Sequence, residues 1–484
     1  MKQFFVSILA VVSFAAFGAR EHVANIQVAH VDELVKGVTQ LGELTGNPMI
    51  GFMASQAIST LPQIKLFGPA RDGESTLFAT YADPEKLNAQ LDKNDVAVAA
   101  LYPIAQSKAD FLATHPDATE KDGVITVKLD ETTLAVVFSE DGKWIAWSDK
   151  KALSKRVIKE VKTASRAMNG DLAKVVVLPK GIKMFADSLA DKMAKEKKDS
   201  PEYCKLAELE MWSKGISSVA IGVRVNEAGL DARVLAKITK GGMLETLCTK
   251  GIEESAWNAL DPKALSASLM AADVGGEYIS WDKIESVLKK HGLDASFISV
   301  KEPVKNYGVY TLDIPALCEY ITKDAEKIAG IDLAALMGDL GGLQSASTKG
   351  FKSPACGASF SVKGASPKTT PKARFEKTLP EAKGKSLCKA DVISFYSTIK
   401  AILPTALAKL ESDERAAIEP LVKSLPEEGA GAIAGAWWRE NDAFRGIVRV
   451  SADEFKGIAA CVNVFMAYQM SQAMQGVETI ENEE

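Results

Sequence analysis

The sequence predicts an α+β protein built from repeated units, in each of which helices pack on one face of a mainly antiparallel sheet. Two observations predict this class. A β-hairpin followed directly by a helix recurs along the chain, and a lone apolar strand that leads into a helix precedes each hairpin. A pattern that recurs at intervals is typical of duplicated units, so we expect five strand-helix-hairpin-helix units. The alternative is that the spacing is coincidental, because the copies match by pattern and not by residue identity.

The hairpin is clearest in residues 134–158. An apolar strand, Leu134 to Phe138, is followed by Glu140-Asp141-Gly142 and a returning strand, Trp144 to Trp147. Asp-Gly between alternating strands predicts a tight turn, because glycine adopts the positive φ that such a turn requires. Further copies are predicted at Val219 to Cys248, turning at Asn226 to Gly229, and at Ala432 to Cys461, turning at Asn441-Asp442. Weaker copies are predicted at Ile64 to Leu91, turning at Asp72-Gly73, and at Ala358 to Glu376, with a Pro-rich turn at Gly364 to Pro371.

The lone strands are apolar runs that each precede a helical pattern. We expect them at Val23 to His30, Val96 to Ile104, Lys174 to Leu178, Leu265 to Ala272 and Ala390 to Phe395. The helix after the fourth strand carries Trp281, Ile284, Val287 and Leu288 on one face, and His291-Gly292 predicts its end. A helix with one apolar stripe has to lie on another surface, and half-buried strands offer it.

Unit boundaries follow from this pattern. We expect a signal peptide at 1–18, two units within 19–165, a third unit at 166–258, a fourth at 259–386, a fifth at 387–476 and an acidic tail at 477–484.

The first residues predict export. Lys2 precedes an apolar run from Phe4 to Phe17, which is shorter than the roughly 20 residues that span a bilayer and has the length of a signal-peptide core. Ala16 and Gly18 supply the small residues of a cleavage site, so we expect cleavage after Gly18 or Ala19. An uncleaved anchor is the alternative. No cysteine lies near this site, so the mature protein is expected to be unlipidated and periplasmic or secreted.

In layout, the chain resembles uncharacterised exported bacterial proteins that carry repeated strand-helix-hairpin-helix units. The resemblance covers most of the mature chain. It implies a bacterial envelope context, and it brings neither catalytic residues nor a reaction.

Composition describes an ordinary globular protein. The 484 residues are 47% hydrophobic and 25% charged, with a formal net charge of -5. This balance gives no electrostatic basis for binding nucleic acid. No second long apolar span follows Phe17, so no transmembrane segment is expected after cleavage.

Chemical motifs are few. The four histidines, His22, His30, His115 and His291, do not have the spacing that places metal ligands on one helical face, and no nucleotide-binding or serine-hydrolase motif occurs. We therefore expect no metal and no cofactor. Ser-x-x-Lys occurs at Ser286 to Lys289 and at Ser397 to Lys400, without the companion motifs of penicillin-binding enzymes.

Adjacent tryptophans offer a possible ligand contact. Trp437 and Trp438 lie in one predicted strand and so point to opposite faces. An exposed one, beside Arg439, could stack on a sugar ring or a peptide; the alternative is that the second indole packs against a neighbouring unit.

The six cysteines are Cys204, Cys248, Cys318, Cys356, Cys388 and Cys461, and none forms a C-x-x-C pair. An even number in an exported protein favours disulfides. The unit boundaries favour sequential bridges, Cys204 to Cys248, Cys318 to Cys356 and Cys388 to Cys461. Buried free thiols are the alternative.

These observations favour an exported, non-enzymatic binding or scaffold protein of the bacterial envelope, with an envelope protein, a glycan or a lipid as its partner. The alternatives are an envelope hydrolase with a dispersed active site and a carrier that holds an apolar ligand such as a lipid between a curved sheet and its helices.

Overall fold

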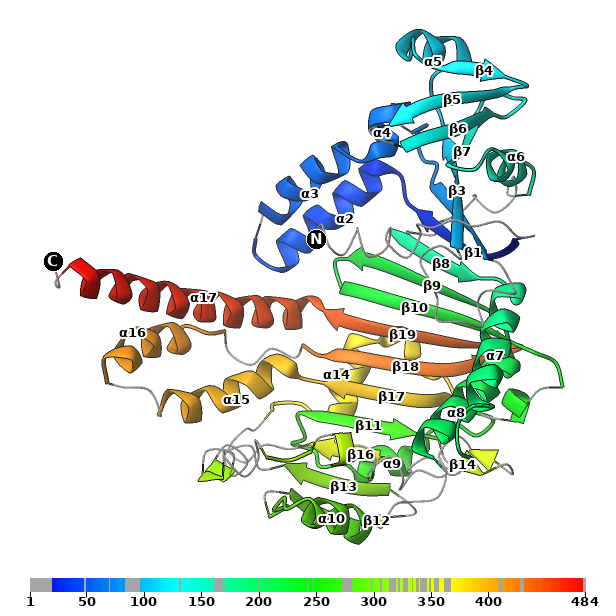
Figure 1. The fold of residues 1–484 in the computed structure, drawn as a ribbon. Helices are drawn as coiled ribbons and strands as arrows, with labels where there is room; N and C mark the ends of the chain where they lie inside the picture. The colour runs from blue at the N-terminus through cyan, green and yellow to red at the C-terminus, as the bar shows by residue number, and fades with distance from the viewer. Residues whose placement is uncertain are drawn as a thin grey trace.

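A computed structural model describes residues 20–481 (Figure 1). The positions left undescribed within this range are 48, 69, 83–95, 130–131, 161–167, 169, 199, 242, 247, 272–280, 297, 305–306, 313–318, 321–322, 325–329, 333, 337–338, 340–345, 348–349, 352–356, 361–366, 409–411 and 427–430. The predicted signal peptide therefore lies outside the described residues. Within them, no helix combines the length and apolarity that crossing a membrane requires.

One antiparallel sheet of 15 strands runs through the molecule, in the order β16-β11-β17-β18-β19-β10-β9-β8-β1-β2-β3-β7-β6-β5-β4. Its strands are β1 (Glu21–Val28), β2 (Thr76–Ala82), β3 (Val96–Pro103), β4 (Thr119–Lys121), β5 (Val124–Leu129), β6 (Thr132–Phe138), β7 (Trp144–Ser148), β8 (Ala173–Val177), β9 (Ile216–Asn226), β10 (Gly229–Ile238), β11 (Ser266–Met270), β16 (Gly357–Phe360), β17 (Leu387–Ile393), β18 (Ile433–Glu440) and β19 (Ala443–Ser451). Two small sheets pair β12 (Ile298–Val304) with β13 (Tyr307–Leu312), and β14 (Ala346–Ser347) with β15 (Gly350–Phe351).

The helices connect and cover these strands. They are α2 (Val31–Leu44), α3 (Met49–Ser59), α4 (Pro62–Phe67), α5 (Lys108–Thr114), α6 (Lys151–Glu160), α7 (Pro179–Met193), α8 (Pro201–Gly215), α9 (Glu254–Ala259), α10 (Trp281–Lys290), α14 (Pro371–Thr378), α15 (Phe395–Leu407), α16 (Ser412–Lys423) and α17 (Ala452–Glu481), with short 3-10 turns η1 (Met243–Thr246) and η2 (Pro380–Ala382). The predicted α+β class is confirmed.

Segments assigned to different predicted units pair edge to edge in the large sheet. The predicted third and fifth units meet through their hairpins, where β10 pairs with β19 from Gly229 opposite Ser451 to Lys237 opposite Ala443. Lone strands meet at two other junctions, where β8 pairs with β1 and β11 pairs with β17. At the fourth junction, β2 pairs with the lone strand β3. Strand edges that would otherwise expose unpaired N–H and C=O groups are thus closed by neighbouring units. The predicted units consequently stand in the order fourth, fifth, third, first, second.

Three predicted hairpins are confirmed as β6-β7, β9-β10 and β18-β19, with Gly142 and Asn441 at positive φ in two of the turns. The prediction of a strand from Ile64 is wrong, because Pro62 begins the helix α4 there. The side chains of Leu66 and Phe67 on this helix are buried in the core. Asp72-Gly73 does form a turn, but it leads into β2, and the hairpin partner of β2 is β3. The segment ending at Glu376 is also helical, because Pro371 begins α14.

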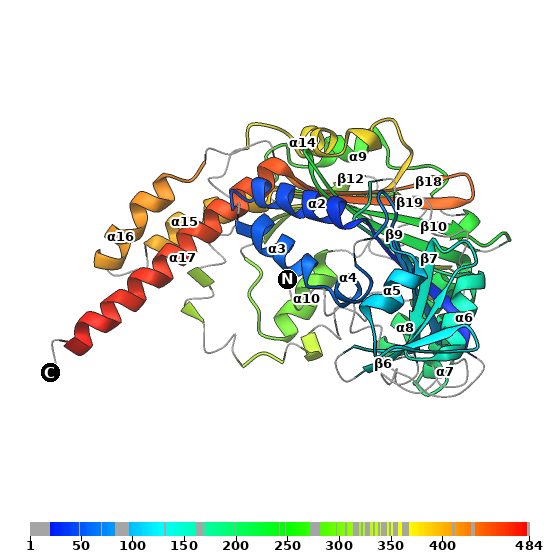
Figure 2. The same cartoon turned by 90° about the horizontal axis from the view of Figure 1, so that it is seen from above.

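Helices lie against both faces of the sheet, whereas the sequence pattern predicted one (Figure 2). We call the face that carries Ala436 and Ile447 face A, and the face that carries Trp437 and Ile221 face B. On face A, α9 and α14 cover β11, β17 and β18, and α6 covers β2 and β3. On face B, α4 and α5 cover β3, β6 and β7.

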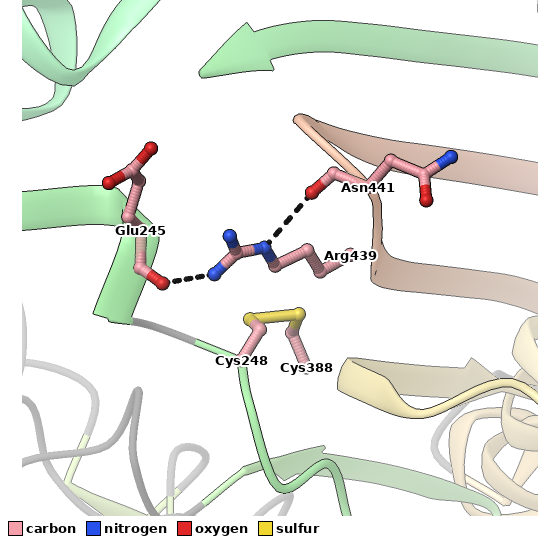
Figure 3. The surroundings of a disulfide bond; sticks show 5 residues. All are labelled: Glu245, Cys248, Cys388, Arg439 and Asn441. Atoms are coloured by element: carbon pink, nitrogen blue, oxygen red, sulfur yellow. Dashed lines mark hydrogen bonds between the residues drawn. A yellow bond between two sulfur atoms is a disulfide. The ribbon is translucent and has the colours of Figure 1, made fainter. Parts of the chain in front are cut away.

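One disulfide joins Cys248 to Cys388, with 5.0 Å between their Cα atoms (Figure 3). It links the predicted third unit to the predicted fifth, so the predicted bridges Cys204 to Cys248 and Cys388 to Cys461 are wrong. The reason is the β10-β19 junction, which brings the loop after β10 beside the start of β17. Cys461 is a free thiol on α17, and burial raises its pKa. Cys318, Cys356 and the Cys204 side chain lie outside the described part of the chain.

Glu454, in the first turn of α17, is buried and accepts a hydrogen bond of 2.8 Å from the backbone N–H of Tyr396 on α15. Burial raises the pKa of this carboxyl. Because the pKa of Glu454 is higher in the folded protein than in the unfolded chain, the folded protein holds this proton at pH values where the unfolded chain has lost it. The stability therefore falls as the pH rises from the unfolded-state pKa to the folded-state pKa. We expect denaturation between pH 4 and pH 8 to show this fall in the wild type but not in Glu454→Gln, which keeps an acceptor oxygen. Parallel pH profiles for the two proteins would contradict the assignment.

Candidate functional site

Aliphatic side chains line face B at the centre of the large sheet. Strand alternation and the pairing register place them on this one face. We call this set the aliphatic face: Val175, Val177, Val219, Ile221, Val223, Val225, Val234, Ile393, Ile433, Val448 and Val450.

The register aligns these residues in rows across the strands. Ile221 of β9 lies opposite Val175 of β8 on one side and Val234 of β10 on the other. Val448 of β19 lies between Ala232 of β10 and Gly435 of β18. Directly opposed side chains on one face are close neighbours, so the rows form one continuous apolar surface.

This surface is covered only in part. Val219 packs against the cluster that contains Leu244, and Val175 packs against Ile26 and Phe78. None of its members is fully buried, and Ile221, Ile393 and Val448 are 41%, 42% and 40% exposed. On face A of the same strands, by contrast, Ala434 and Ala436 are 0% exposed and Ile447 is 4% exposed. Aliphatic residues at the middle of a sheet are normally buried, and a contiguous exposed apolar surface marks a place where another molecule binds.

Two features border the aliphatic face. Trp437 lies against Gly446, where an added Cβ would stand 2.8 Å from the indole ring, and it packs beside the Cys248–Cys388 bridge and Phe444. On the other border, Asp391 of β17 forms an ion pair of 3.1 Å with Lys389 and accepts a hydrogen bond of 2.5 Å from Ser268 of β11. The aliphatic face therefore ends at a charged cluster.

Other exposed apolar side chains lie on helices, and α3 and α17 carry three each among the described residues. Met49, Phe52 and Met53 on α3 are each at least 55% exposed, and Val462, Phe465 and Met466 on α17 are each at least 46% exposed. The helix α17 continues directly from β19 and extends beyond the sheet (Figure 1). Apolar surface is thus exposed both on the central sheet and on helices attached to it.

The structure separates the three residues predicted as ligand-facing. Trp437 points to face B, and Trp438 points to face A, where its ring is 8% exposed and belongs to the core under α14. Arg439 donates hydrogen bonds to the backbone carbonyls of Glu245 and Asn441 beside the disulfide (Figure 3). The buried Trp438 ring is not open for stacking, whereas Trp437 is half-buried and borders the aliphatic face.

Neither Ser-x-x-Lys motif forms a serine-lysine pair. Lys289 bonds Glu285 at 2.9 Å, and Lys400 donates to the carbonyl of Pro426 at 2.8 Å while Ser397 is buried. His291 follows the last residue of α10, and its Nε2 lies 2.8 Å from Oδ2 of Asp339. Among the described residues, no group of His, Cys, Asp and Glu side chains could hold a metal ion.

Sequence reasoning did not identify the aliphatic face. The signal was present in β9, where residues 219–225 alternate aliphatic with small or charged residues. Alternation predicts a face but cannot show whether a helix covers it.

No protein-family model matches this chain, and no curated protein matches it. Among solved structures, crystal form IV of TP0453 is similar with a TM-score of 0.21 and 6% sequence identity, over 47% of this chain and 79% of that one. A likeness at that level carries no argument about fold or function.

Proposed function

We propose that this chain is an exported, non-enzymatic binding protein of the bacterial envelope that holds an amphipathic lipid on its aliphatic face. The observation that carries the proposal is the incomplete burial of every member of this face at the centre of a sheet of 15 strands. The signal-peptide pattern and the disulfide between Cys248 and Cys388 support a periplasmic or secreted location, since disulfides persist in oxidising compartments.

An acyl chain suits this surface. The members are valines and isoleucines, whose side chains make no hydrogen bonds. They can therefore bury an acyl chain in any orientation, because the hydrophobic effect is not directional. Covering apolar surface contributes about 25 cal/mol per Å² on each side of the contact. A flexible chain can follow the rows between neighbouring strands, which lie roughly 4.8 Å apart.

The charged cluster at the border suits a polar head group. Lys389 and Asp391 lie on face B beside Ile393, and the Lys389 side chain is 39% exposed. A ligand with an apolar chain on the aliphatic face could place its head group at this cluster, where both a cation and a carboxylate are available. An amphipathic lipid satisfies both parts of the surface.

The test is to purify the mature protein from the periplasm of a bacterial host and to measure bound lipid by native mass spectrometry and solvent extraction. We expect lipid on the wild type and a fall of about tenfold, or ~1.4 kcal/mol, in Val448→Asp. A carboxylate in the apolar row has to be desolvated when an acyl chain covers it. Because Val448 is 40% exposed, the folded protein itself should tolerate the change.

Leu421→Asp on α16 is the matched control, since Leu421 is 36% exposed and lies on a helix away from the aliphatic face. It should keep the wild-type lipid content. A wild type without lipid, or equal loss in both variants, would contradict the proposal. A stoichiometric protein partner released by Val448→Asp would instead identify a scaffold.

A further inference from the structure

The opposite face of the same central strands carries a groove of about 600 Å³. It lies on face A over β8, β9, β10, β19 and β18, between the region covered by α14 and the region covered by α6. We call it the polar groove. Its charged and aromatic lining consists of Asp171, Lys174, Arg233, Glu381, Lys385, Trp438, Glu440 and Arg445.

The carboxylates of the polar groove already have cationic partners. Asp171 accepts a hydrogen bond from Arg233, and Glu440 pairs with Arg445 and, at 3.7 Å, with Lys385. Glu381 binds Arg449 at 2.7 Å. Four cations and three carboxylates line the groove, so a positive charge is in excess.

The hydrogen-bond donors, by contrast, are not all used. Lys174 makes no ion pair with any described residue. The indole N–H of Trp438 and the Nε–H of Arg233 are buried without an acceptor in the described part of the chain. Trp438 is 8% exposed, and a buried donor without a partner costs about 1–3 kcal/mol. These three groups of the polar groove, on Lys174, Trp438 and Arg233, are all hydrogen-bond donors.

A glycine shapes the floor of the groove. A Cβ on Gly222 would lie 2.4 Å from Oδ2 of Asp171, so only glycine leaves room for this carboxylate beside β9. Asp171 in turn fixes the guanidinium of Arg233. Arg233 is thus held in place by its ion pair with Asp171. Lys174 of β8, which lies opposite Gly222 of β9, has no such ion pair with a described residue.

We infer that the polar groove is a second binding site, for a small ligand that carries an anionic oxygen group, either a phosphate or a carboxylate. Excess positive charge and unused donors are the chemistry that recognises such a group. The volume lies within the roughly 300–1,000 Å³ of small-molecule sites. This site opens on the opposite face of the sheet from the aliphatic face, with which it shares Val234 of β10. The inference does not rest on lipid binding.

The experiment titrates the full mature protein with two probes, inorganic phosphate and glucuronate, and follows the indole N–H signals of its seven tryptophans by NMR. We expect one probe to shift the Trp438 signal saturably, with Trp438→Phe assigning that signal. The probe that binds more tightly identifies the phosphate or the carboxylate class. Lys174→Gln should weaken binding by about tenfold, as loss of one charge-assisted contact predicts.

Lys237→Gln is the matched control, because it also removes one lysine charge. Lys237 is exposed on face A of β10 and lies outside the groove lining. Its affinity should remain that of the wild type. If neither probe shifts the Trp438 signal, the inference is overturned. Equal weakening by Lys174→Gln and Lys237→Gln would also overturn it, because binding would then reflect only net charge.

Discussion

Replacing Arg449 with methionine should lower the free energy of unfolding by about 3–5 kcal/mol. Arg449 of β19 binds Asp231 of β10 through two bonds of 2.5 and 2.7 Å, and it also binds Glu381 and the carbonyl of Thr378. The side chains of Arg449 and Asp231 are 9% and 3% exposed. The substitution leaves the Asp231 carboxylate buried without its partner, and its desolvation is then uncompensated. Urea denaturation followed by circular dichroism measures the effect.

Arg445→Met is the control, because Arg445 lies on the same strand and face and pairs with Glu440, but is 48% exposed. Exposed ion pairs contribute at most about 1 kcal/mol, so this variant should lose little stability. A second variant, Asp231→Leu with Arg449→Met, should recover most of the loss, since replacing both partners removes the unpaired charge. If Arg445→Met and Arg449→Met cost the same, the buried pair is not what stabilises the β10-β19 junction.

Removing the disulfide by Cys248→Ser together with Cys388→Ser should cost roughly 2–5 kcal/mol. The two cysteines are separated by 140 residues, so the bridge restricts a long loop of the unfolded chain. It also holds the segment after η1 against the start of β17. Denaturation of the oxidised wild type, the reduced wild type and the double variant measures this effect.

Cys461→Ser is the control for the loss of a thiol, because Cys461 is free, and it should change stability by less than about 0.5 kcal/mol. Peptide mapping without reductant should recover one peptide pair that links Cys248 to Cys388. Recovery of Cys204 linked to Cys248, or of Cys388 linked to Cys461, would restore the sequential bridges and contradict the structure.

The sequence predicted the elements that depend on neighbouring residues. Asp141-Gly142 and Asn441-Asp442 specify their turns because the residue that adopts positive φ lies within the turn itself. Helix α10 ends at His291-Gly292 for the same reason, with Gly292 at positive φ. The predicted strand at Ile64 is wrong, because Pro62 begins a helix there.

The sequence by itself determined that this chain contains hairpins, strands and helices, because turn residues and apolar periodicity act over a few positions. Only the tertiary structure decided which unit stands beside which, since any free strand edge can pair with any other. That choice placed Cys248 beside Cys388 and Asp231 beside Arg449, both of which are pairs of residues far apart in the chain. It also left face B of β9, β10 and β19 incompletely covered, because coverage depends on where helices from distant segments pack. The aliphatic face and the polar groove are both consequences of this long-range order.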